Sequence, residues 1–284
     1  MIYVKLMGGL GNQMFQYAFG KAFSLKHKIP FAADLSFYEE THPLSEVTPR
    51  EFEIDVFNIH FDSIVKKEPY LFFEHSLLKR VERKLKANHF LDEVGFDFQE
   101  NLLSFHDDVV FKGYFQTEKY FFDIRNVLLQ DFTPRSSLTS LSLSYIEEAH
   151  NVESVSIHIR RGDYVTSSYH HSCDLLYYSK AIHLIAQKKS NLKLYIFSDD
   201  IAWVKNELQF DFPCVYVEHN VGKKSFEDLM IMKACKHNII ANSSFSWWGA
   251  WLGEQQDKIV VAPLGWFKKG ISSKDLVPER WVRI

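Results

Sequence analysis

The chain has 284 residues, of which 46% are apolar and 24% are charged, a composition typical of globular proteins. This excludes a disordered, collagen-like or disulfide-scaffold protein, and the length allows one large domain or two modest ones. With 33 basic and 36 acidic side chains the formal net charge is −3, so we expect no broad electrostatic attraction to nucleic acid. The three cysteines form no CxxC pair and indicate buried thiols in a reducing compartment.

The N-terminal segment lacks the pattern of a signal peptide, because Lys5 interrupts its first apolar run. Nowhere do about 18 apolar residues follow one another, so we expect no membrane-spanning helix. The sequence therefore predicts a soluble, cytoplasmic protein and is compatible with peripheral contact at the inner face of a membrane.

The first half of the chain starts with a regular α/β pattern and then becomes irregular. A strand leads into a glycine turn and a helix with apolar residues at helical spacing, and a second strand ends at Asp34. The next hundred or so residues are rich in Phe and show few clear periods. The elements expected here are strands over 2–7, 29–33 and 109–111 and helices over 12–28 and 77–86.

The second half is more regular. Pro and Ser interrupt both periodicities at 133–137, so we expect a linker there between domains at 1–135 and 136–284, and the C-terminal tail could return to the first domain. Beyond the linker, short apolar strands alternate with helices, which indicates βαβ units and a parallel sheet. The expected strands cover 155–159, 192–197, 214–218, 238–241 and 258–262, and the expected helices 174–188, 200–209, 225–236 and 246–254.

Parallel sheets bind ligands at the carboxyl ends of their strands, and the segment SIHIRRGDY (156–164) ends such a strand. Alternation places His158 and Arg160 on one side, with Arg160 at the carboxyl end. A guanidinium there offers a rigid fork of donors for phosphate oxygens. The plainer alternative is a surface pair, Arg160 and Arg161, with an ion pair to Asp163.

A second strand end carries the segment NSSFSWW (242–248) in front of a helix. Free backbone N–H groups and the positive end of the helix dipole make this junction a candidate anion site. Ser243 and Ser244 would add hydroxyl donors. The alternative is a helix N-cap with an aromatic core behind it.

Two further segments leave helix capping and ligand binding open. Ser225 and Asp228 fit a capping box, whereas the functional interpretation has Asp228 accepting hydrogen bonds from a nucleobase amine or a ribose. Asp199 follows another expected strand, and we expect it to cap the next helix.

The segment GGLGNQM (8–14) combines a strand end, a glycine turn and a helix, so its backbone could approach a ligand closely. It begins like the GxGxxG of dinucleotide-binding proteins, and Asp34 occupies the place of the ribose-binding acid, but Met14 replaces the third glycine. An NAD-binding enzyme is therefore one alternative function, and a tight turn without a ligand is another interpretation.

Metal binding finds little support in the sequence. His170, His171 and Cys173 have no partner spacing typical of zinc, and the chain contains no Asp-x-Asp. We therefore expect phosphate to be neutralised by Arg and a helix dipole, without a metal ion. The absence of GxxxxGK[ST] and GxSxG argues against a P-loop NTPase and an α/β-hydrolase.

Together, GGLGNQMFQYAFG (8–20), HIRRGDYV (158–165), IFSDD (196–200) and NSSFSWWGAWL (242–252) resemble the bacterial α-1,2-fucosyltransferases of glycosyltransferase family 11. The resemblance implies a GT-B-like α/β fold, with two Rossmann-like domains facing across a cleft, an acceptor-side N-terminal domain and a C-terminal domain that binds GDP-fucose. It also implies metal-independent, inverting transfer of L-fucose from GDP-β-L-fucose to the 2-hydroxyl of a galactoside, in O-antigen or other surface polysaccharide synthesis.

The resemblance also implies roles for individual residues. Arg160 binds the diphosphate, and Asp163 completes the same motif as base or scaffold, so these two are the catalytic candidates. A carbohydrate-binding protein without catalysis remains a second alternative, although it leaves the arginine pair and the two serines unexplained. The implied donor-binding residues are His158, Arg160, Asp228, Ser243, Ser244 and Phe245, with Gly9, Gly11 and Asn12 reaching the site from the opposite domain.

Overall fold

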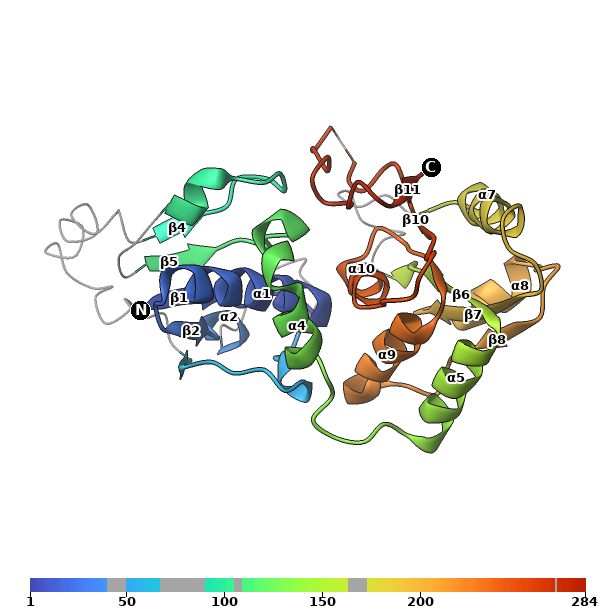
Figure 1. Ribbon diagram of the computed structural model, residues 1–284, viewed down its shortest axis with the longest axis horizontal. Coiled ribbons are helices and arrows are strands. Elements are labelled where there is room, and N and C mark those ends of the chain that lie inside the picture. The colour runs from blue at the N-terminus through green and yellow to red at the C-terminus, as the bar shows by residue number, and fades with distance from the viewer. Residues whose placement is uncertain (40–49, 67–89, 105–108, 163–172, 269) are drawn as a thin grey trace, which may run out of the picture. The chain divides into compact units, whose positions relative to one another are not determined.

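The computed structural model describes residues 1–39, 50–66, 90–104, 109–162, 173–268 and 270–284 (Figure 1). The helix expected over 77–86 and the candidate Asp163 lie outside these residues. By its internal contacts the chain divides into two compact units. Unit 1 comprises Met1–Arg135 and Lys274–Leu276, and unit 2 comprises Ser136–Ser273 and Val277–Ile284.

Unit 1 is built on a five-stranded sheet with the order β3-β2-β1-β5-β4, and every pair of neighbours is parallel. Helix α1 (Leu10–His27) connects β1 to β2 and packs on the sheet. The strands are β1 (Ile2–Lys5), β2 (Phe31–Asp34), β3 (Ser63–Val65), β4 (Phe90–Asp92) and β5 (Val109–Lys112).

Aromatic side chains form much of the core of unit 1. Phe19 of α1 stacks on Phe115 with 3.9 Å between ring centroids and meets Phe111 of β5 edge-on. Gly20 lets α1 approach the sheet closely, because a Cβ there would lie 2.4 Å from the ring of Phe31. The unit also contains α2 (Ser36–Glu39), α4 (Arg125–Asp131) and short 3-10 turns at Ile54–Val56, Glu100–Ser104, Glu118–Tyr120 and Phe122–Ile124.

Unit 2 is built on a six-stranded, entirely parallel sheet with the order β11-β10-β9-β6-β7-β8. The strands are β6 (Glu153–Ile159), β7 (Leu192–Ser198), β8 (Cys214–Tyr216), β9 (His237–Ile239), β10 (Val260–Ala262) and β11 (Val282–Arg283). The helices are α5 (Ser140–Asn151), α7 (Leu175–Ala186), α8 (Ile201–Glu207), α9 (Phe226–Ala234) and α10 (Ser244–Trp251).

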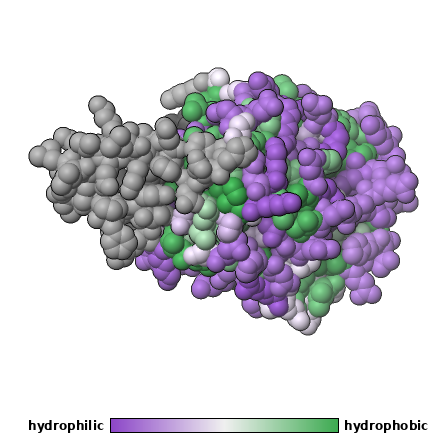
Figure 2. Space-filling view, turned by 60° about the vertical axis from the view of Figure 1, so that its left-hand side comes forward, coloured by the Kyte–Doolittle hydropathy of each residue, from purple (hydrophilic) through white to green (hydrophobic). Residues whose placement is uncertain are grey.

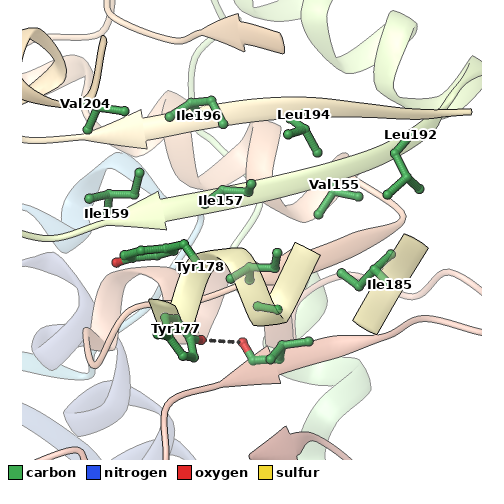
Figure 3. Packing of buried hydrophobic residues seen from close by; sticks show 13 residues of the cluster. Val155, Ile157, Ile159, Tyr177, Tyr178, Ile185, Leu192, Leu194, Ile196 and Val204 are labelled. Carbon is green, nitrogen blue, oxygen red and sulfur yellow. Dashed lines mark hydrogen bonds between the residues drawn. The ribbon is translucent and has the colours of Figure 1, made fainter. Parts of the chain in front are cut away.

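Alternating side chains of β6 and β7 divide the core of unit 2 between two faces. Val155, Ile157 and Ile159 pack with α7 and α8 (Figure 3), whereas Tyr195 and Phe197 pack with α5 and α9. The two clusters therefore cover both faces of the sheet, as the continuous apolar strands predict.

The structure confirms the α/β class and, within the described residues, most of the expected elements, whose bounds shift by a few residues. Helices α4 and α5 and the short strands β3, β4 and β11 were not expected.

All three cysteines are free, with Cys235 buried and the other two half-buried. No helix within the described ranges combines the length and apolarity needed to cross a bilayer. On the face in Figure 2, hydrophobic residues lie in scattered patches among hydrophilic ones.

Candidate functional site

Three candidate segments of unit 2 lie along one edge of its sheet. Strand β6 lies between β9 and β7, so Arg160 after β6, Asp199 after β7 and Ser243 after β9 share the carboxyl edge. Open α/β sheets bind their ligands at this edge. The structure therefore brings together segments that are more than 80 residues apart in the sequence.

Arg160 is held by an acidic residue of the neighbouring strand end. Its Nη1 lies 3.0 Å from Oδ2 of Asp199, and both side chains are 23% exposed. Oδ1 of the same carboxylate accepts a hydrogen bond from the backbone N–H of Arg161 at 2.8 Å. Asp199 thus orients the guanidinium at this edge of the sheet, a role that the sequence did not predict.

Asp199 does not cap helix α8, so that expectation is wrong. The N-cap is Asp200, whose Oδ1 accepts from the N–H of Trp203 at 3.2 Å. Asp200 also lies 3.5 Å from Nε of Arg161, whose guanidinium stacks 3.5 Å above the Trp203 ring. Asp199 and Asp200 therefore each form an ion pair with one residue of the arginine pair.

His158 lies in β6, two residues before Arg160, and is 7% exposed. Burial, reinforced by the nearby charge of Arg160, lowers its pKa to about 3, so the imidazole is neutral at physiological pH. Its Nδ1 is buried and has no hydrogen-bond partner among the described residues. The ring centroid lies 6.1 Å from that of Phe245 on α10. His158 therefore offers a neutral ring with an unused polar atom.

Helix α10 presents an open N-terminus at the same edge. Its first internal hydrogen bond runs from Trp247 N–H to Ser243 O at 3.0 Å, and its first turn holds no acidic residue. The preceding amides, those of Ser244, Phe245 and Ser246, therefore face the helix end that attracts anions. Ser243 occupies the N-cap position in an extended conformation, as the capping alternative expects, but its side chain makes no capping hydrogen bond.

Buried aromatic rings and a hydrogen bond of Asn242 hold helix α10 in place. Trp247, Trp248 and Trp251 are fully buried and in mutual ring contact. Asn242, also buried, donates from Nδ2 to the carbonyl of Trp266 at 2.9 Å. The packing thus fixes the direction of the helix axis, and the buried Ser246 hydroxyl donates to Ser243 O at 3.3 Å.

Asp228 is a half-buried carboxyl near the start of α9. Burial raises its pKa to about 7, although a hydrogen bond from Asn220 Nδ2 to its Oδ1 at 2.7 Å opposes this shift and Glu227 adds to it. The capping box is not formed, because Ser225 has a helical backbone and makes no side-chain capping bond. That expectation is wrong, and Asp228 has no capping role.

Polar side chains of α5 and of the loop before α9 hold this carboxyl in place. Asn220, which is buried, donates to Ser142 Oγ at 3.3 Å, and Ser142 Oγ lies 2.9 Å from His219 Nε2. Beside them, Glu227 Oε2 accepts from both the N–H and the hydroxyl of Thr139, at 2.9 and 2.7 Å. The start of α5 is therefore fastened to the start of α9.

The glycine turn lies in unit 1, and the contacts of its residues described here are made within that unit. Gly8 has φ +76°, and a Cβ there would meet the amide of Asn12 at 2.5 Å. Asn12 Oδ1 accepts from Gln116 Nε2 at 2.8 Å, while Gly9 is the N-cap of α1 and Gly11 lies buried in its first turn. The donor-binding roles of Gly9, Gly11 and Asn12 stay predictions.

A carboxylate occupies the place that a dinucleotide phosphate would need. Oε2 of Glu53 accepts the N–H of Leu10, the first residue of α1, at 3.1 Å. Gln13 holds this segment through bonds from the N–H groups of Glu53 and Ile54 to its Oε1, at 2.9 and 3.0 Å. A fixed negative charge at this helix end repels phosphate, which argues against NAD binding at the turn.

A comparison with protein families decides the relationship. The model of the family described as "Glycosyl transferase family 11" matches residues 1–284, the entire chain. This protein belongs to glycosyltransferase family 11. The family resemblance of its motifs is thereby confirmed, and the chain is a glycosyltransferase.

Two curated proteins of Escherichia coli are similar to this family 11 member over their full length. An alpha-1,2-colitosyltransferase is 35% identical over 298 residues, covering 100% of this chain and 99% of that protein. The O-antigen biosynthesis glycosyltransferase WbnK is 33% identical over 310 residues, covering 100% of both chains.

Solved structures show the fold of this glycosyltransferase. The NodZ alpha-1,6-fucosyltransferase co-crystallised with GDP superposes with a TM-score of 0.50 at 12% identity, covering 89% of this chain and 92% of that one. POFUT1 in complex with GDP gives a TM-score of 0.50 at 12% identity, covering 92% and 97%. The likeness, together with the two parallel sheets, confirms a GT-B-like α/β fold.

Several residues of this family 11 site carried no signal that sequence reasoning used. The sequence predicts a capping role for Asp199, and Asn220 and Ser142 belong to no motif that points to ligand binding. Within the described part of the chain, no three His, Cys, Asp or Glu side chains are grouped as metal ligands. Metal independence and the role of Asp163 stay predictions.

Proposed function

We propose that the protein transfers L-fucose from GDP-β-L-fucose to the 2-hydroxyl of a galactoside acceptor, with inversion, to form an α-1,2 linkage. Family 11 membership supports sugar transfer, and the names of the E. coli relatives support an α-1,2 linkage and a role in O-antigen synthesis. The observation that carries the proposal is that Arg160 and the open N-terminus of α10 share one sheet edge.

A diphosphate is the ligand that fits this edge. Arg160 supplies a delocalised positive charge with several N–H donors. The Ser244, Phe245 and Ser246 amides add donors and the positive end of the helix dipole. Asp199 already pairs with Arg160. An incoming phosphate oxygen therefore either binds Arg160 beside that carboxylate or displaces the carboxylate from it. The ion pair therefore keeps the guanidinium oriented before the donor binds.

The nucleoside end of the donor fits the rest of the edge. Ionised Asp228 would accept hydrogen bonds from the N1–H and the exocyclic amine of guanine. Neutral His158 lies near Arg160 and Phe245 and adds no second positive charge to the site. GDP is bound in the NodZ and POFUT1 structures, which supports a guanosine diphosphate donor for the shared fold.

The reaction breaks the C1–O bond of fucose and leaves the electron pair on the β-phosphate. Donors fixed in advance around that oxygen stabilise the growing charge, and one such donor is typically worth about 10²–10³ in rate. The acceptor oxygen attacks C1 from the opposite face of the ring, which inverts the configuration. Its proton passes to a base, for which the HxRRxD motif offers Asp163.

Nucleotide binding tests the donor class without any acceptor. GDP, UDP and NAD are compared by thermal shift in buffer containing EDTA, because a ligand that binds the folded state raises the apparent Tm by mass action. We expect a shift with GDP alone. A shift with NAD and none with GDP would refute a GDP-sugar donor.

A transfer assay tests the sugar and the acceptor. GDP-fucose and GDP-colitose are offered separately with lactose, and the linkage of the product is determined by NMR. Colitose is L-fucose without the 3-hydroxyl, and a site that hydrogen-bonds a hydroxyl discriminates strongly against its absence. We expect faster transfer of fucose; the 35% identity to the colitosyltransferase makes colitose the competing donor. Activity in EDTA is expected, and its loss would refute metal independence.

We further propose a cytoplasmic reaction at the inner face of a membrane, serving surface polysaccharide assembly. The support is the O-antigen role in the name of WbnK. Fractionation of cells that make the tagged protein tests this location.

A further inference from the structure

The loop that follows strand β8 carries a buried amide beside the candidate guanine contact. Asn220 lies in this loop, at the carboxyl edge of the unit 2 sheet, and is 8% exposed. Its Nδ2 donates to Oδ1 of Asp228 on α9 at 2.7 Å. Both residues belong to unit 2, so the carboxyl group has a fixed partner within a single unit.

Asn220 is itself held from helix α5. The hydroxyl oxygen of Ser142 lies 3.3 Å from Nδ2 and 3.4 Å from Oδ1 of Asn220. The same oxygen lies 2.9 Å from Nε2 of His219, whose ring meets that of Tyr145 edge-on with 5.5 Å between centroids. Helices α5 and α9 pack side by side (Figure 1). The amide is therefore held in place by the same pair of helices that carries Asp228.

A carboxylate needs such a partner if it is to recognise a base. The carboxyl group of an Asp turns easily about its last side-chain bond. Guanine offers two parallel donors, N1–H and the exocyclic amine, and both can bond only when the plane of the carboxylate lines up with them. The hydrogen bond from Asn220 uses one of about four lone-pair positions on Asp228 and fixes that plane.

The same bond acts on the ionisation of Asp228. Burial is the largest cause of its raised pKa of about 7, the hydrogen bond from Asn220 lowers the pKa, and the charge of Glu227 raises it. Glu227 in turn interacts with Lys224, in the turn before α9, and with His219 in the loop after β8. Asn220 and Glu227 thus act on the carboxyl group in opposite directions, which a pH profile can distinguish.

We propose that Asn220 is a positioning residue for donor recognition: it sets the plane of the Asp228 carboxylate so that both oxygens meet guanine. Ser142 and His219 hold Asn220 in the orientation that this requires. The inference rests on the proposed function, in which Asp228 contacts guanine, and adds the group that makes this contact selective. Without the amide, the carboxylate turns and keeps at most one of the two hydrogen bonds to the base.

Inosine diphosphate tests the orientation, since its base has the N1–H of guanine but lacks the exocyclic amine. Calorimetry at pH 8 compares its affinity with that of GDP. The ratio of the two affinities cancels the ionisation of Asp228, on which both nucleotides depend equally. We expect the wild type to bind GDP about tenfold more tightly, the contribution of one further charged hydrogen bond. Asn220→Ala should reduce this ratio below about threefold, whereas a purely structural role would weaken both nucleotides equally.

The pH dependence of GDP affinity tests the ionisation. Protonation of Asp228 weakens binding and produces an acid limb, which should move to higher pH in Asn220→Ala, because a bond that favours the charged form is lost. Glu227→Gln should move the limb to lower pH, because it removes a like charge while the Gln oxygen can still accept from Thr139. Damage to the fold alone would not shift the two limbs in opposite directions.

Glu218→Gln is the matched control, because Glu218 is exposed in the same loop and forms an ion pair with Lys205. It should change neither the nucleotide ratio nor the acid limb. If Asn220→Ala does not fold, Ser142→Ala replaces it, because it removes the hydroxyl that holds Asn220. This variant should lower the nucleotide ratio at least about twofold and move the acid limb to higher pH.

Three results would overturn the role of Asn220 while leaving the proposed function intact. The first is a wild type that binds GDP and inosine diphosphate equally. The second is a wild-type nucleotide ratio in folded Asn220→Ala, or in Ser142→Ala where that variant replaces it. The third is an acid limb that stays in place or moves to lower pH in the same variant. A wild-type protein that does not bind GDP would refute the proposed function itself.

Discussion

Replacing Asp228 by Asn should make the protein more stable and a poorer binder of GDP. The substitution removes a charge that the fold disfavours, since burial raises the carboxyl pKa from 3.8 to about 7. It keeps the oxygen that accepts from Asn220 at 2.7 Å. The variant therefore leaves the Asn220–Ser142 hydrogen bonds in place and changes mainly the ionisation at this position.

The size of the effect follows from the two pKa values. Their difference corresponds to a free-energy penalty of at most about 4 kcal/mol for the ionised carboxyl group. Because Asp228 is partly exposed, we expect Asp228→Asn to raise the free energy of unfolding by about 1–3 kcal/mol. Because the pKa is raised in the folded state, the native protein holds more protons than the unfolded chain between pH about 4 and about 7. The free energy of unfolding of the wild type therefore falls as pH rises through this window and levels off above it.

Asn does not titrate, so the stability advantage of Asp228→Asn should grow between about pH 4 and 7 and stay constant at higher pH. Urea unfolding at pH 4.5, 6 and 8 measures it, and exposed Asp211→Asn is the control. Calorimetry at pH 8 should show GDP binding weakened by about 10–100-fold, the loss of a charged hydrogen bond. A stability difference that is the same at every pH would refute the raised pKa, and unchanged GDP affinity would refute the contact with guanine.

Three other substitutions test the remaining parts of the structure. Arg160→Ala should lower kcat by at least about 10² with little change in Tm, because it removes a donor aimed at the leaving phosphate, and near-normal kcat in a folded variant would remove Arg160 from this role. Gly162→Ala places a Cβ 2.5 Å from Oδ2 of Asp199 and should displace the carboxylate that orients Arg160, which kinetics would show as a loss of at least about tenfold in kcat/KM. Gly20→Ala should lower the free energy of unfolding by about 1–3 kcal/mol in urea, because its Cβ would overlap the buried ring of Phe31; an unchanged or raised stability would mean that α1 can move away from the sheet.

The sequence predicted the fold best where the strands are buried on both faces. The apolar runs of β6 and β7 read clearly, since a strand covered by helices on both sides needs apolar residues at nearly every position. Helix α5 was missed because its buried face is thin: Ser142 and Ala149 are its buried residues. Its sequence, SLSLSYIEEAHN, starts with an alternation that is typical of strands, and the contact of Glu227 with Thr139 secures its start.

The candidate site likewise contains residues that the sequence could locate and residues that it could not. Arg160 and the serines of α10 could be located from sequence, because a position after a buried strand defines the edge on which a residue lies. Their partners could not, because Asp199 is adjacent to Asp200 and a shift of one residue decides which of them caps α8. The burial of Asp228 depends on contacts with a distant segment around Ser142, and no local pattern in the sequence records it.

The raised pKa of Asp228 should affect kcat/KM for the donor more than it affects kcat. Asp228 must be ionised to bind guanine, so its protonation below about pH 7 weakens donor binding and lowers kcat/KM for the donor. Saturating donor suppresses this effect, because binding of GDP stabilises the ionised form. An acid limb of kcat/KM that persists unchanged in Asp228→Asn would show that another group causes this pH dependence.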